Sequence, residues 1–332
     1  MTRIVRTLST VTDDFTSEIQ QAARTSEAHA KLIQKCDTLH QVELAGSATK
    51  KLLKSEVSVV AWNLERCLFP EESADLIATC DADVVLLSEV DYGMARTKQR
   101  HTTAVIADRL GMQYAYGVEF LEMSLGMEVE KQFCDDDFNT LGFHGNAVLS
   151  RVPLERVAMF RLDNYGHWFA VDRGADPEQP RLGGRMAIAA VVSTQNGPIC
   201  VVSVHLESCA QPPHRQTEME SLIKHIEAFA KDMPVIIGGD LNTGNDVPPD
   251  FDWRHEGLFE AAIKRGYSWD ASPVGSTIRT SLITDNTGRE MRLDWFATKS
   301  LNCQHSAIIP ALDPQAKVLS DHEMIHCIVT TS

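Results

Sequence analysis

Short apolar runs that end in polar residues recur along most of this chain. Val84–Leu87 is followed, after one serine, by Glu89, and Val235–Ile237 is followed, after two glycines, by Asp240. Apolar runs of three or four residues between turn signals are typical of buried strands, and they suit burial on one or both faces of a sheet. The pattern therefore predicts layered sheets with polar side chains gathered where the strands end.

Helical segments alternate with these strands from about residue 57 onwards. Helices are expected over Ser73–Thr79, with Ser73 as its cap, over Thr102–Leu110, which Gly111 ends, and over Gln216–Ala230. The strands expected in the same part of the chain are Val57–Trp62, Val84–Leu87, Gly145–Ser150, Met186–Val192, Ile199–Val204, Val235–Ile237, Leu293–Ala297 and Met324–Val329. This alternation puts helices outside the sheet layers. Periodicity alone does not decide between one sheet and two.

Five polar clusters at the ends of apolar runs could meet at one rim. They are Asn63-Leu64-Glu65, Ser88-Glu89, His205, Asp240-Leu241-Asn242 and Ser320-Asp321-His322. Their oxygen atoms are hard ligands suited to Mg²⁺ or Mn²⁺, with Ca²⁺ as a further candidate, and the lack of close-set Cys or His ligands argues against zinc. Two histidines and a carboxylate beside such an ion would supply acid and base for hydrolysis of a phosphate ester. The clusters predict a metal-dependent phosphoesterase.

Seven segments also form a recognisable series. They are Trp62-Asn63-Leu64-Glu65, Leu87-Ser88-Glu89-Val90-Asp91, Gly145-Asn146-Ala147-Val148-Leu149-Ser150-Arg151, Ser203-Val204-His205-Leu206-Glu207, Gly238-Gly239-Asp240-Leu241-Asn242, Arg292-Leu293-Asp294-Trp295-Phe296 and Ser320-Asp321-His322. In this order they resemble the endonuclease/exonuclease/phosphatase superfamily, which includes deoxyribonuclease I, abasic-site endonucleases, neutral sphingomyelinases and inositol polyphosphate phosphatases. The resemblance implies an α+β fold, a four-layer α/β/β/α sandwich of two mixed sheets packed face to face with outer helices, and a catalytic domain over residues 56–332.

The resemblance also implies which residues hold the metal. Glu89 would be the principal ligand, and a carboxylate placed after an apolar run is costly to bury unless it is paired or binds a cation. Asn63, Glu65 and Asp321 would complete the metal environment, directly or through water. Glu65 departs from the aspartate often seen in the nucleases of this family.

The predicted catalytic groups are carboxylates, an amide and two imidazoles. Asp240 would orient or deprotonate the attacking water, and Asn242, which projects to the same side of an extended segment, would hold that water or a phosphoryl oxygen. His205 is assigned to phosphate stabilisation or leaving-group protonation. The resemblance pairs Asp294 with His322, an arrangement that fixes the tautomer of the imidazole and raises its basicity. His322 would either deprotonate water or stabilise the transition state.

The substrate-binding residues are less directly indicated. Asn146 matches an asparagine that contacts the scissile phosphate in the family, whereas Phe143 stands where some abasic-site endonucleases have a tyrosine, which weakens assignment to that subgroup. Arg96 and Arg100 lie in the loop after the metal-binding glutamate and are predicted to clamp a second phosphate or carboxylate, as is Arg185.

Charge bears on the substrate class. The chain has 31 basic and 46 acidic residues, and its formal charge of −15 repels polyanions at long range unless a local basic groove compensates. This favours a small organic phosphate or lipid headgroup, with cleavage of a diester or a monoester left open, over DNA or RNA endo- or exonuclease activity. The irregular segment 163–184 is predicted to cover a substrate pocket. A non-catalytic binding module on the same fold is a weaker alternative, because the principal catalytic side chains are all present.

The first 55 residues carry no catalytic pattern. Their uneven apolar stripe, which includes Leu32, Ile33 and Leu39, predicts a helical N-terminal extension over residues 1–55 that packs on the catalytic domain or on a second copy of the chain. Eight cysteines without a CxxC pair are read as free thiols. No apolar stretch of signal-peptide or membrane-spanning length is visible. The sequence therefore predicts a soluble cytoplasmic protein with no transmembrane segment and with homo-oligomer contacts as a candidate role for the extension.

Overall fold

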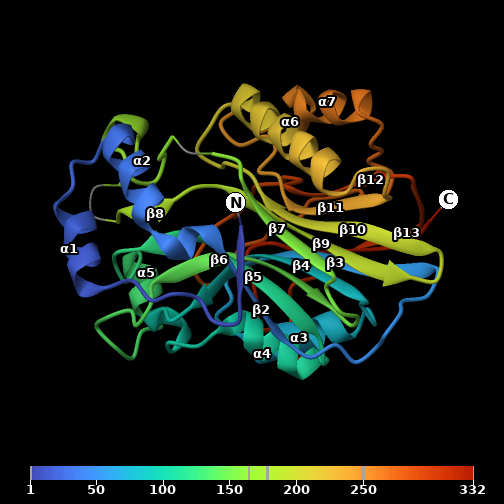
Figure 1. Ribbon diagram of the computed structural model, residues 1–332, viewed down its shortest axis with the longest axis horizontal. Helices are drawn as coiled ribbons and strands as arrows, with labels where there is room; N and C mark the ends of the chain where they lie inside the picture. The colour runs from blue at the N-terminus through green and yellow to red at the C-terminus, as the bar shows by residue number, and fades with distance from the viewer. Residues whose placement is uncertain (1, 164, 177–178, 248–250, 332) are drawn as a thin grey trace.

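Two mixed β-sheets packed face to face form the centre of the molecule (Figure 1). The computed structural model describes residues 2–163, 165–176, 179–247 and 251–331. Within these ranges the larger sheet has nine strands, in the order β1 (Arg3–Val5), β2 (Gln41–Gly46), β5 (Gln113–Glu122), β6 (Phe143–Ser150), β4 (Val84–Tyr92), β3 (Glu56–Arg66), β14 (Met324–Thr331) and β13 (Leu301–Ile309), with β8 (Arg181–Gly183) beside β5. The smaller sheet has five, in the order β12 (Asp294–Lys299), β11 (Val235–Asp240), β10 (Gly197–His205), β9 (Met186–Thr194) and β7 (Arg156–Arg161).

Helices cover the outer faces of both sheets and one end of the sandwich. The larger sheet is covered by α3 (Pro70–Ala78) and α4 (Thr102–Leu110), and the smaller sheet by α6 (Pro212–Phe229) and α7 (Leu258–Lys264) (Figure 1). The remaining helices are α1 (Asp13–Gln21), α2 (Ser26–Lys35) and α5 (Glu128–Lys131), and short 3₁₀ turns lie at Asp37–His40, Ala95–Thr97, Val171–Arg173 and Trp253–His255. The predicted four-layer α/β/β/α sandwich is confirmed.

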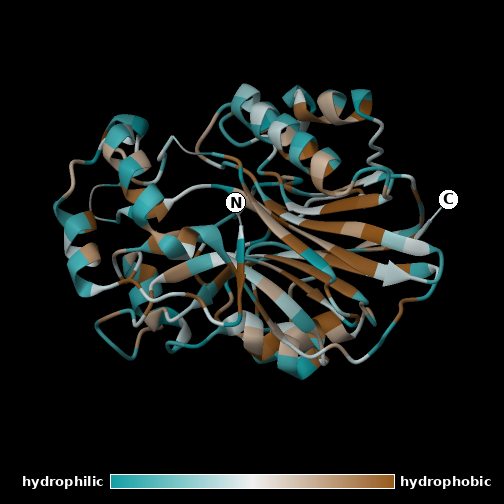
Figure 2. Cartoon of the chain, viewed as in Figure 1, coloured by the Kyte–Doolittle hydropathy of each residue, from teal (hydrophilic) through white to brown (hydrophobic). Residues whose placement is uncertain are grey.

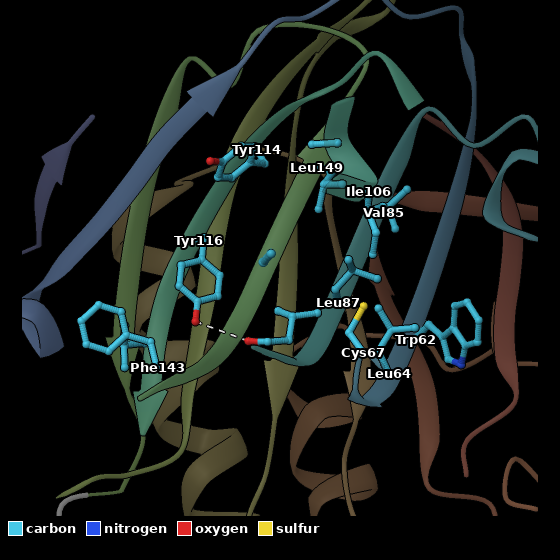
Figure 3. Close-up of a cluster of buried hydrophobic side chains, with 14 of the residues drawn as sticks. Trp62, Leu64, Cys67, Val85, Leu87, Ile106, Tyr114, Tyr116, Phe143 and Leu149 are labelled. Atoms are coloured by element: carbon cyan, nitrogen blue, oxygen red, sulfur yellow. Dashed lines mark hydrogen bonds between the residues drawn. The ribbon is translucent and has the colours of Figure 1, made fainter. Parts of the chain in front are cut away.

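The continuous apolar runs of the sequence belong to strands that are buried on both faces. On β4, Val84 and Leu86 lie in the core between the two sheets, whereas Val85 and Leu87 lie in the core beneath α3 and α4. Figure 3 shows this outer cluster, in which the hydroxyl of Tyr116 donates a hydrogen bond of 3.3 Å to the carbonyl of Val90. Because alternate residues of a strand face opposite layers, two-sided burial requires an apolar residue at each position. Figure 2 shows the strands as predominantly hydrophobic and the outer helices as mixed.

The directions of the strands bring the predicted site residues to one rim of the sandwich. β3 pairs in parallel with β4, and β10 with β11, so the carboxyl ends of each pair lie together. β12 runs antiparallel to β11 and β14 runs antiparallel to β3, so these two strands begin at the same rim. Residues that end β10 and β11 and residues that begin or precede β12 and β14 are therefore neighbours despite their distance in sequence.

The predicted starts of two helices were wrong, and α6 begins at Pro212 rather than Gln216. α3 begins at Pro70 rather than Ser73, and its N-cap residue Phe69 makes no side-chain cap. Proline fits the first turn because its missing N–H would be unpaired there and its φ angle is already helical. Ser73 lies buried inside the helix instead.

The N-terminal extension contains strands as well as helices. β1 pairs with β2, and β2 pairs in antiparallel fashion with β5, so residues 41–46 belong to the larger sheet. The division of the chain at residue 55 stays a prediction, and this pairing shows that the extension is continuous with the sheet. Among the described helices, none has both the length and the apolar character that crossing a membrane requires.

Candidate active site

The ends of the two central strand pairs place two imidazoles and two carboxylates side by side. His205 stands opposite Asp240 in the β10–β11 ladder, and Asp240 stands opposite Asp294 in the β11–β12 ladder. His322 lies just before β14, and its Nδ1 is 2.8 Å from Oδ2 of Asp294. These four predicted catalytic residues are almost fully buried. The structure brings them together as one group.

Asp240 lies between the two imidazoles. Its Oδ2 is 3.6 Å from Nε2 of His205 and 3.7 Å from Nε2 of His322. The same oxygen accepts a hydrogen bond of 3.0 Å from Nδ2 of Asn63, while Oδ1 accepts one of 2.8 Å from the main-chain N–H of Asn242. Both carboxylate oxygens of Asp240 therefore accept hydrogen bonds, and Oδ2 lies between the rings of His205 and His322.

The environment of His322 favours its charged form. Burial opposes the charge, but Asp294, Asp240 and Asp321 outweigh that effect and hold the pKa of His322 well above its usual value. Burial raises the pKa of Asp294, although its contact with His322 acts in the opposite direction. With Nδ1 directed to Asp294, Nε2 faces Asp240 and can donate a hydrogen bond to an anion bound between them.

The four predicted metal ligands form an oxygen-rich group next to these imidazoles. Nδ2 of Asn63 donates a hydrogen bond of 3.3 Å to Oε1 of Glu89, which lies 3.9 Å from Nε2 of His205. Oε2 of Glu65 accepts a hydrogen bond of 3.1 Å from the main-chain N–H of Asp321. Glu65, Glu89 and Asp321 are thus gathered from three separate segments.

Buried negative charge makes this group suitable for a cation. Burial, followed by repulsion from Asp321, raises the pKa of Glu65 to about 8. Burial also raises the pKa of Asp321 to about 6, against the attraction of His322 and with a further contribution from Glu89. Carboxylates whose ionisation is suppressed by each other and by burial are stabilised by a divalent cation. The donor set of carboxylate and amide oxygens fits Mg²⁺ or Mn²⁺.

The structure adds a guanidinium that the sequence analysis did not single out. Arg66 donates a hydrogen bond to Oε2 of Glu89, and its Nε lies 2.7 Å from Oε1 of Glu130. Burial opposes ionisation of Glu89, but Arg66 and the nearby histidines hold its pKa well below the ordinary value. The position of Arg66 directly after Glu65 was the available signal. Its effect is to keep Glu89 ionised and to fix one of its oxygens.

His205 has its own ring of partners. Nη1 of Arg185 lies 2.9 Å from Nδ1 of His205, and Oε2 of Glu119 lies 3.1 Å from the same nitrogen. Arg185 is also held by Oε2 of Glu207 at 3.3 Å. The predicted Arg185 is therefore part of the group, and Glu119 is a residue that the sequence analysis missed, although a glutamate inside the apolar β5 was a signal for it.

The remaining predicted residues differ in position. Asn146 on β6 is buried, its Nδ2 donates to the carbonyl of Met186 at 3.2 Å, and among the described residues its Oδ1 has no hydrogen-bond partner. Asn242 donates to the carbonyl of Leu206 at 3.0 Å. Arg96 is fully buried and bonded to Asp91, Glu122 and Glu130, and Arg100 pairs with Glu71 near α3. Neither arginine contacts the imidazole group.

Several residues of the site hold unusual backbone angles. Glu65, Glu89 and Asn242 have φ values of 44°, 55° and 50°, in the left-handed region. Gly239 has φ of 150°, and a Cβ there would lie 2.0 Å from the carbonyl oxygen of Val204. Left-handed backbone costs a non-glycine residue on the order of 1–3 kcal/mol, and it is maintained where the surrounding structure over-determines it. In β3 and β4 these angles coincide with register shifts in the strand pairing, between Asn63 and Arg66 and between Leu87 and Val90.

The chain is similar in sequence to known proteins over most of this region. The sequence pattern of the "Endonuclease/Exonuclease/phosphatase family" matches residues 60–322. A protein of Escherichia coli strain K12, "Uncharacterized protein YbhP", is 25% identical over 209 residues, which is 60% of this chain and 66% of that protein. The match thus spans slightly less than two thirds of that relative.

Solved structures resemble the fold. An endonuclease/exonuclease/phosphatase from Beutenbergia cavernae DSM 12333 is 16% identical with a TM-score of 0.56, over 83% of this chain and 72% of that one. The mannosyl-6-phosphatase Bt3783 of Bacteroides thetaiotaomicron VPI-5482 is 14% identical with a TM-score of 0.56, over 82% and 99%. The human Nocturnin catalytic domain with bound sulfate anion is 15% identical with a TM-score of 0.52, over 88% and 97%. At these identities the likeness establishes the fold alone.

Proposed function

Because the chain belongs to the endonuclease/exonuclease/phosphatase family, we propose that it hydrolyses a phosphate ester with the help of Mg²⁺ or Mn²⁺. The observation that carries the proposal is the position of Asp240, with one oxygen 3.6 Å from His205 and 3.7 Å from His322. A carboxylate between two imidazoles, next to an oxygen-rich cation site, suits attack of water on a phosphoryl group.

Each side chain then has a defined task. The cation, when bound by Glu89, Asn63, Glu65 and Asp321, would offset negative charge on the phosphoryl oxygens. Asp240 orients the attacking water and accepts its proton. His322, kept charged by Asp294, donates a hydrogen bond to a phosphoryl oxygen.

The other groups around the phosphate bind and orient it. His205, fixed by Arg185 and Glu119, protonates the leaving oxygen or stabilises its charge. Asn146 and Asn242 hold phosphoryl oxygens through their side-chain amides. Arg185 adds positive charge at the base of this group, where its guanidinium is already held in place by carboxylates.

A small organic phosphate or a lipid headgroup is the proposed substrate class. The formal charge of −15 opposes the approach of a polyanion. The name of one structural relative, mannosyl-6-phosphatase, supports a monoester as the first candidate, and DNA or RNA remains the alternative. Arg96 and Arg100 are bonded to carboxylates in this structure, so a role for them in the proposed clamp requires those ion pairs to open.

The proposal is tested by turnover on a panel of phosphomonoesters, phosphodiesters and duplex DNA, with Mg²⁺ and with Mn²⁺. Glu89→Gln and His322→Ala are each expected to reduce kcat by at least about 100-fold, because they remove the cation's main ligand and the phosphoryl donor. His225→Ala, an exposed residue of α6, is the matched control. Unchanged turnover in both site variants would refute the assignment, and preferred cleavage of duplex DNA would overturn the substrate class.

Location and assembly are part of the proposal as well. Each of the eight cysteines is free, which supports a reducing compartment such as the cytoplasm. The helices α1 and α2 of the N-terminal extension are the proposed contact with a second copy of the chain. Size-exclusion chromatography with light scattering tests that contact, and a monomer at micromolar concentration would remove it.

A further inference from the structure

Asp163, His167 and His214 form a second group of metal-binding side chains. Each offers one ligand atom, and these atoms all lie within 4.8 Å of one another. Asp163 follows β7 and His167 lies in the irregular segment after it, whereas His214 is in the first turn of α6 (Figure 1). Two parts of the chain that are distant in sequence thus converge here. None of the three residues belongs to the proposed catalytic set.

The carboxylate of this group is held in place. The side chain of Asp163 is only 1% exposed, and its Oδ2 is 2.8 Å from Nδ1 of His167. Its Oδ1 accepts a hydrogen bond of 2.9 Å from the main-chain N–H of Tyr165. The rings of His167 and His214 meet edge to face, with centroids 4.9 Å apart. The group is therefore built before any ligand arrives.

Two buried polar atoms beside this group point to a missing ligand. Nε2 of His214 and Oε1 of Glu218 are buried and, within the described part of the chain, lack a hydrogen-bond partner. They lie 3.8 Å apart, beyond hydrogen-bond distance, and belong to residues four apart on one face of α6. The side chain of Glu218 is 1% exposed, and its other oxygen accepts a hydrogen bond of 2.9 Å from the N–H of Glu207. Buried polar groups without a partner are destabilising, and an ion between these two atoms would satisfy both.

Carboxylates gather around the group. Besides Asp163, the side chains of Glu218 and Glu207 are buried here, and the N–H of Glu207 donates a hydrogen bond of 2.9 Å to Glu218. A divalent cation offsets negative charge that is gathered in such a buried place.

We propose that Asp163, His167 and His214 bind a zinc ion beside the buried carboxylate of Glu218. Two imidazoles and carboxylates suit Zn²⁺, whereas Mg²⁺ and Ca²⁺ favour oxygen atoms alone. Such an ion ties the described residues 165–176, which precede β8, to the amino end of α6. The sequence shows no closely spaced zinc ligands, because His214 lies far along the chain from His167.

The bound ion acts next to the catalytic group without joining it. Glu207 accepts hydrogen bonds from Nε1 of Trp168, in the tethered segment, and from Arg185, which contacts His205. The N–H of Glu207 also binds Glu218. An ion on His167 therefore acts through the neighbouring Trp168 on Glu207, the carboxylate that holds Arg185.

Calorimetric titration of the metal-free full chain with Zn²⁺, in excess Mg²⁺, tests the proposal. We expect one tightly bound zinc, and a Co²⁺ substitute with the visible absorption of a tetrahedral site. His214→Gln and Asp163→Asn are each expected to weaken that binding by at least about 10–100-fold. The control is His225→Ala, on the same helix with its Nδ1 bonded to the carbonyl of Ser221. Zinc should also protect residues 165–176 from proteolysis in the control and not in the variants.

A second variant distinguishes the proposed zinc site from the catalytic cation site. Glu89→Gln is expected to retain the tight zinc, since its carboxylate is not a ligand there. Zinc binding that is lost in Glu89→Gln and retained in His214→Gln would overturn the proposal, as would equal affinity in the wild type and both ligand variants. Circular dichroism of each metal-free variant verifies folding, and His167→Gln replaces any variant that does not fold.

Discussion

Two histidine–aspartate pairs of this protein have the same geometry and different surroundings. Nδ1 of His322 is 2.8 Å from Asp294, and Nδ1 of His167 is 2.8 Å from Asp163. For His167, the hydrogen bond with Asp163 is the largest influence, and it raises the pKa of the imidazole. For His322, burial is the largest single influence and lowers the pKa, but the three nearby aspartates together outweigh it. The pair alone therefore does not define what an imidazole does.

The two histidine–aspartate pairs differ in the third side chain that lies beside them. The second nitrogen of His322 faces the carboxylate of Asp240, which keeps the ring charged and ready to donate to an anion. His167 instead lies against a second imidazole, that of His214, and the two rings form the proposed metal group with Asp163. The two pairs also differ in placement, because the first stands where strands begin, whereas the second lies in the segment after β7 and meets α6 only through His214. Strand ends hold side chains rigidly, as catalysis requires, whereas a metal ion shared by a loop and a helix would fix the loop to the helix.

The largest effect is expected from Asp294→Asn. Loss of the carboxylate removes the group that orients and charges His322, and removal of the corresponding carboxylate in hydrolytic triads costs about 10⁴-fold in kcat. We expect a loss on the order of 10³-fold or more, measured as turnover of the best phosphate ester from the panel. Asp163→Asn, which alters the other pair, should change kcat at least about 10-fold less. Equal losses would mean that the two pairs have the same role.

A smaller effect, on stability, is expected from Ser320→Ala. The buried hydroxyl of Ser320 donates a hydrogen bond of 2.7 Å to the carbonyl of Asn63 and accepts one of 3.0 Å from the N–H of His322. Its removal breaks both of these buried hydrogen bonds and should lower the free energy of unfolding by about 1–3 kcal/mol. Urea denaturation measures this, with the exposed Ser47→Ala as control. A change below that of the control would show that this support is dispensable.

The smallest effect concerns pH and separates the two imidazoles. A histidine whose pKa is raised on folding contributes stability that is fully present below its unfolded pKa, near 6.5, and that is lost as pH rises through the folded value. In metal-free protein, His322→Gln should therefore flatten the fall in unfolding free energy above about pH 6.5, by up to about 1.4 kcal/mol per pH unit. His167→Gln should flatten it less, because His167 is less buried. The reverse order would contradict the comparison.

Local signals in the sequence were sufficient for much of the fold. α4 has the predicted bounds, since Gly111 ends it with φ of 63°, and the strand-like apolar runs became β3, β4, β10 and β11. The strands β1 and β2 were not predicted, because their side chains lack a clear pattern and their pairing depends on β5. The face-to-face arrangement of the sheets came from family resemblance and not from periodicity.

The candidate site was predictable to a similar extent. Residues in short motifs at strand ends, such as Glu89, His205 and Asp240, are brought together by the structure. Arg66 and Glu119 were missed, because a buried charge acquires its role from partners that are distant in sequence. The arginines of the loop after Glu89 were chosen for their charge, and charge alone does not reveal that carboxylates already surround them.

The left-handed backbone of Glu65, Glu89 and Asn242 has an energetic consequence. Glycine adopts such angles without cost, so replacement of Glu89 by glycine would relieve conformational energy while removing the oxygen that the cation needs. Glycine at residue 89 would also leave the buried Arg66 without one of its carboxylate partners, so the contacts of the site oppose that gain in stability. The strain is thus secured by the same ion pair that holds the side chain for the cation.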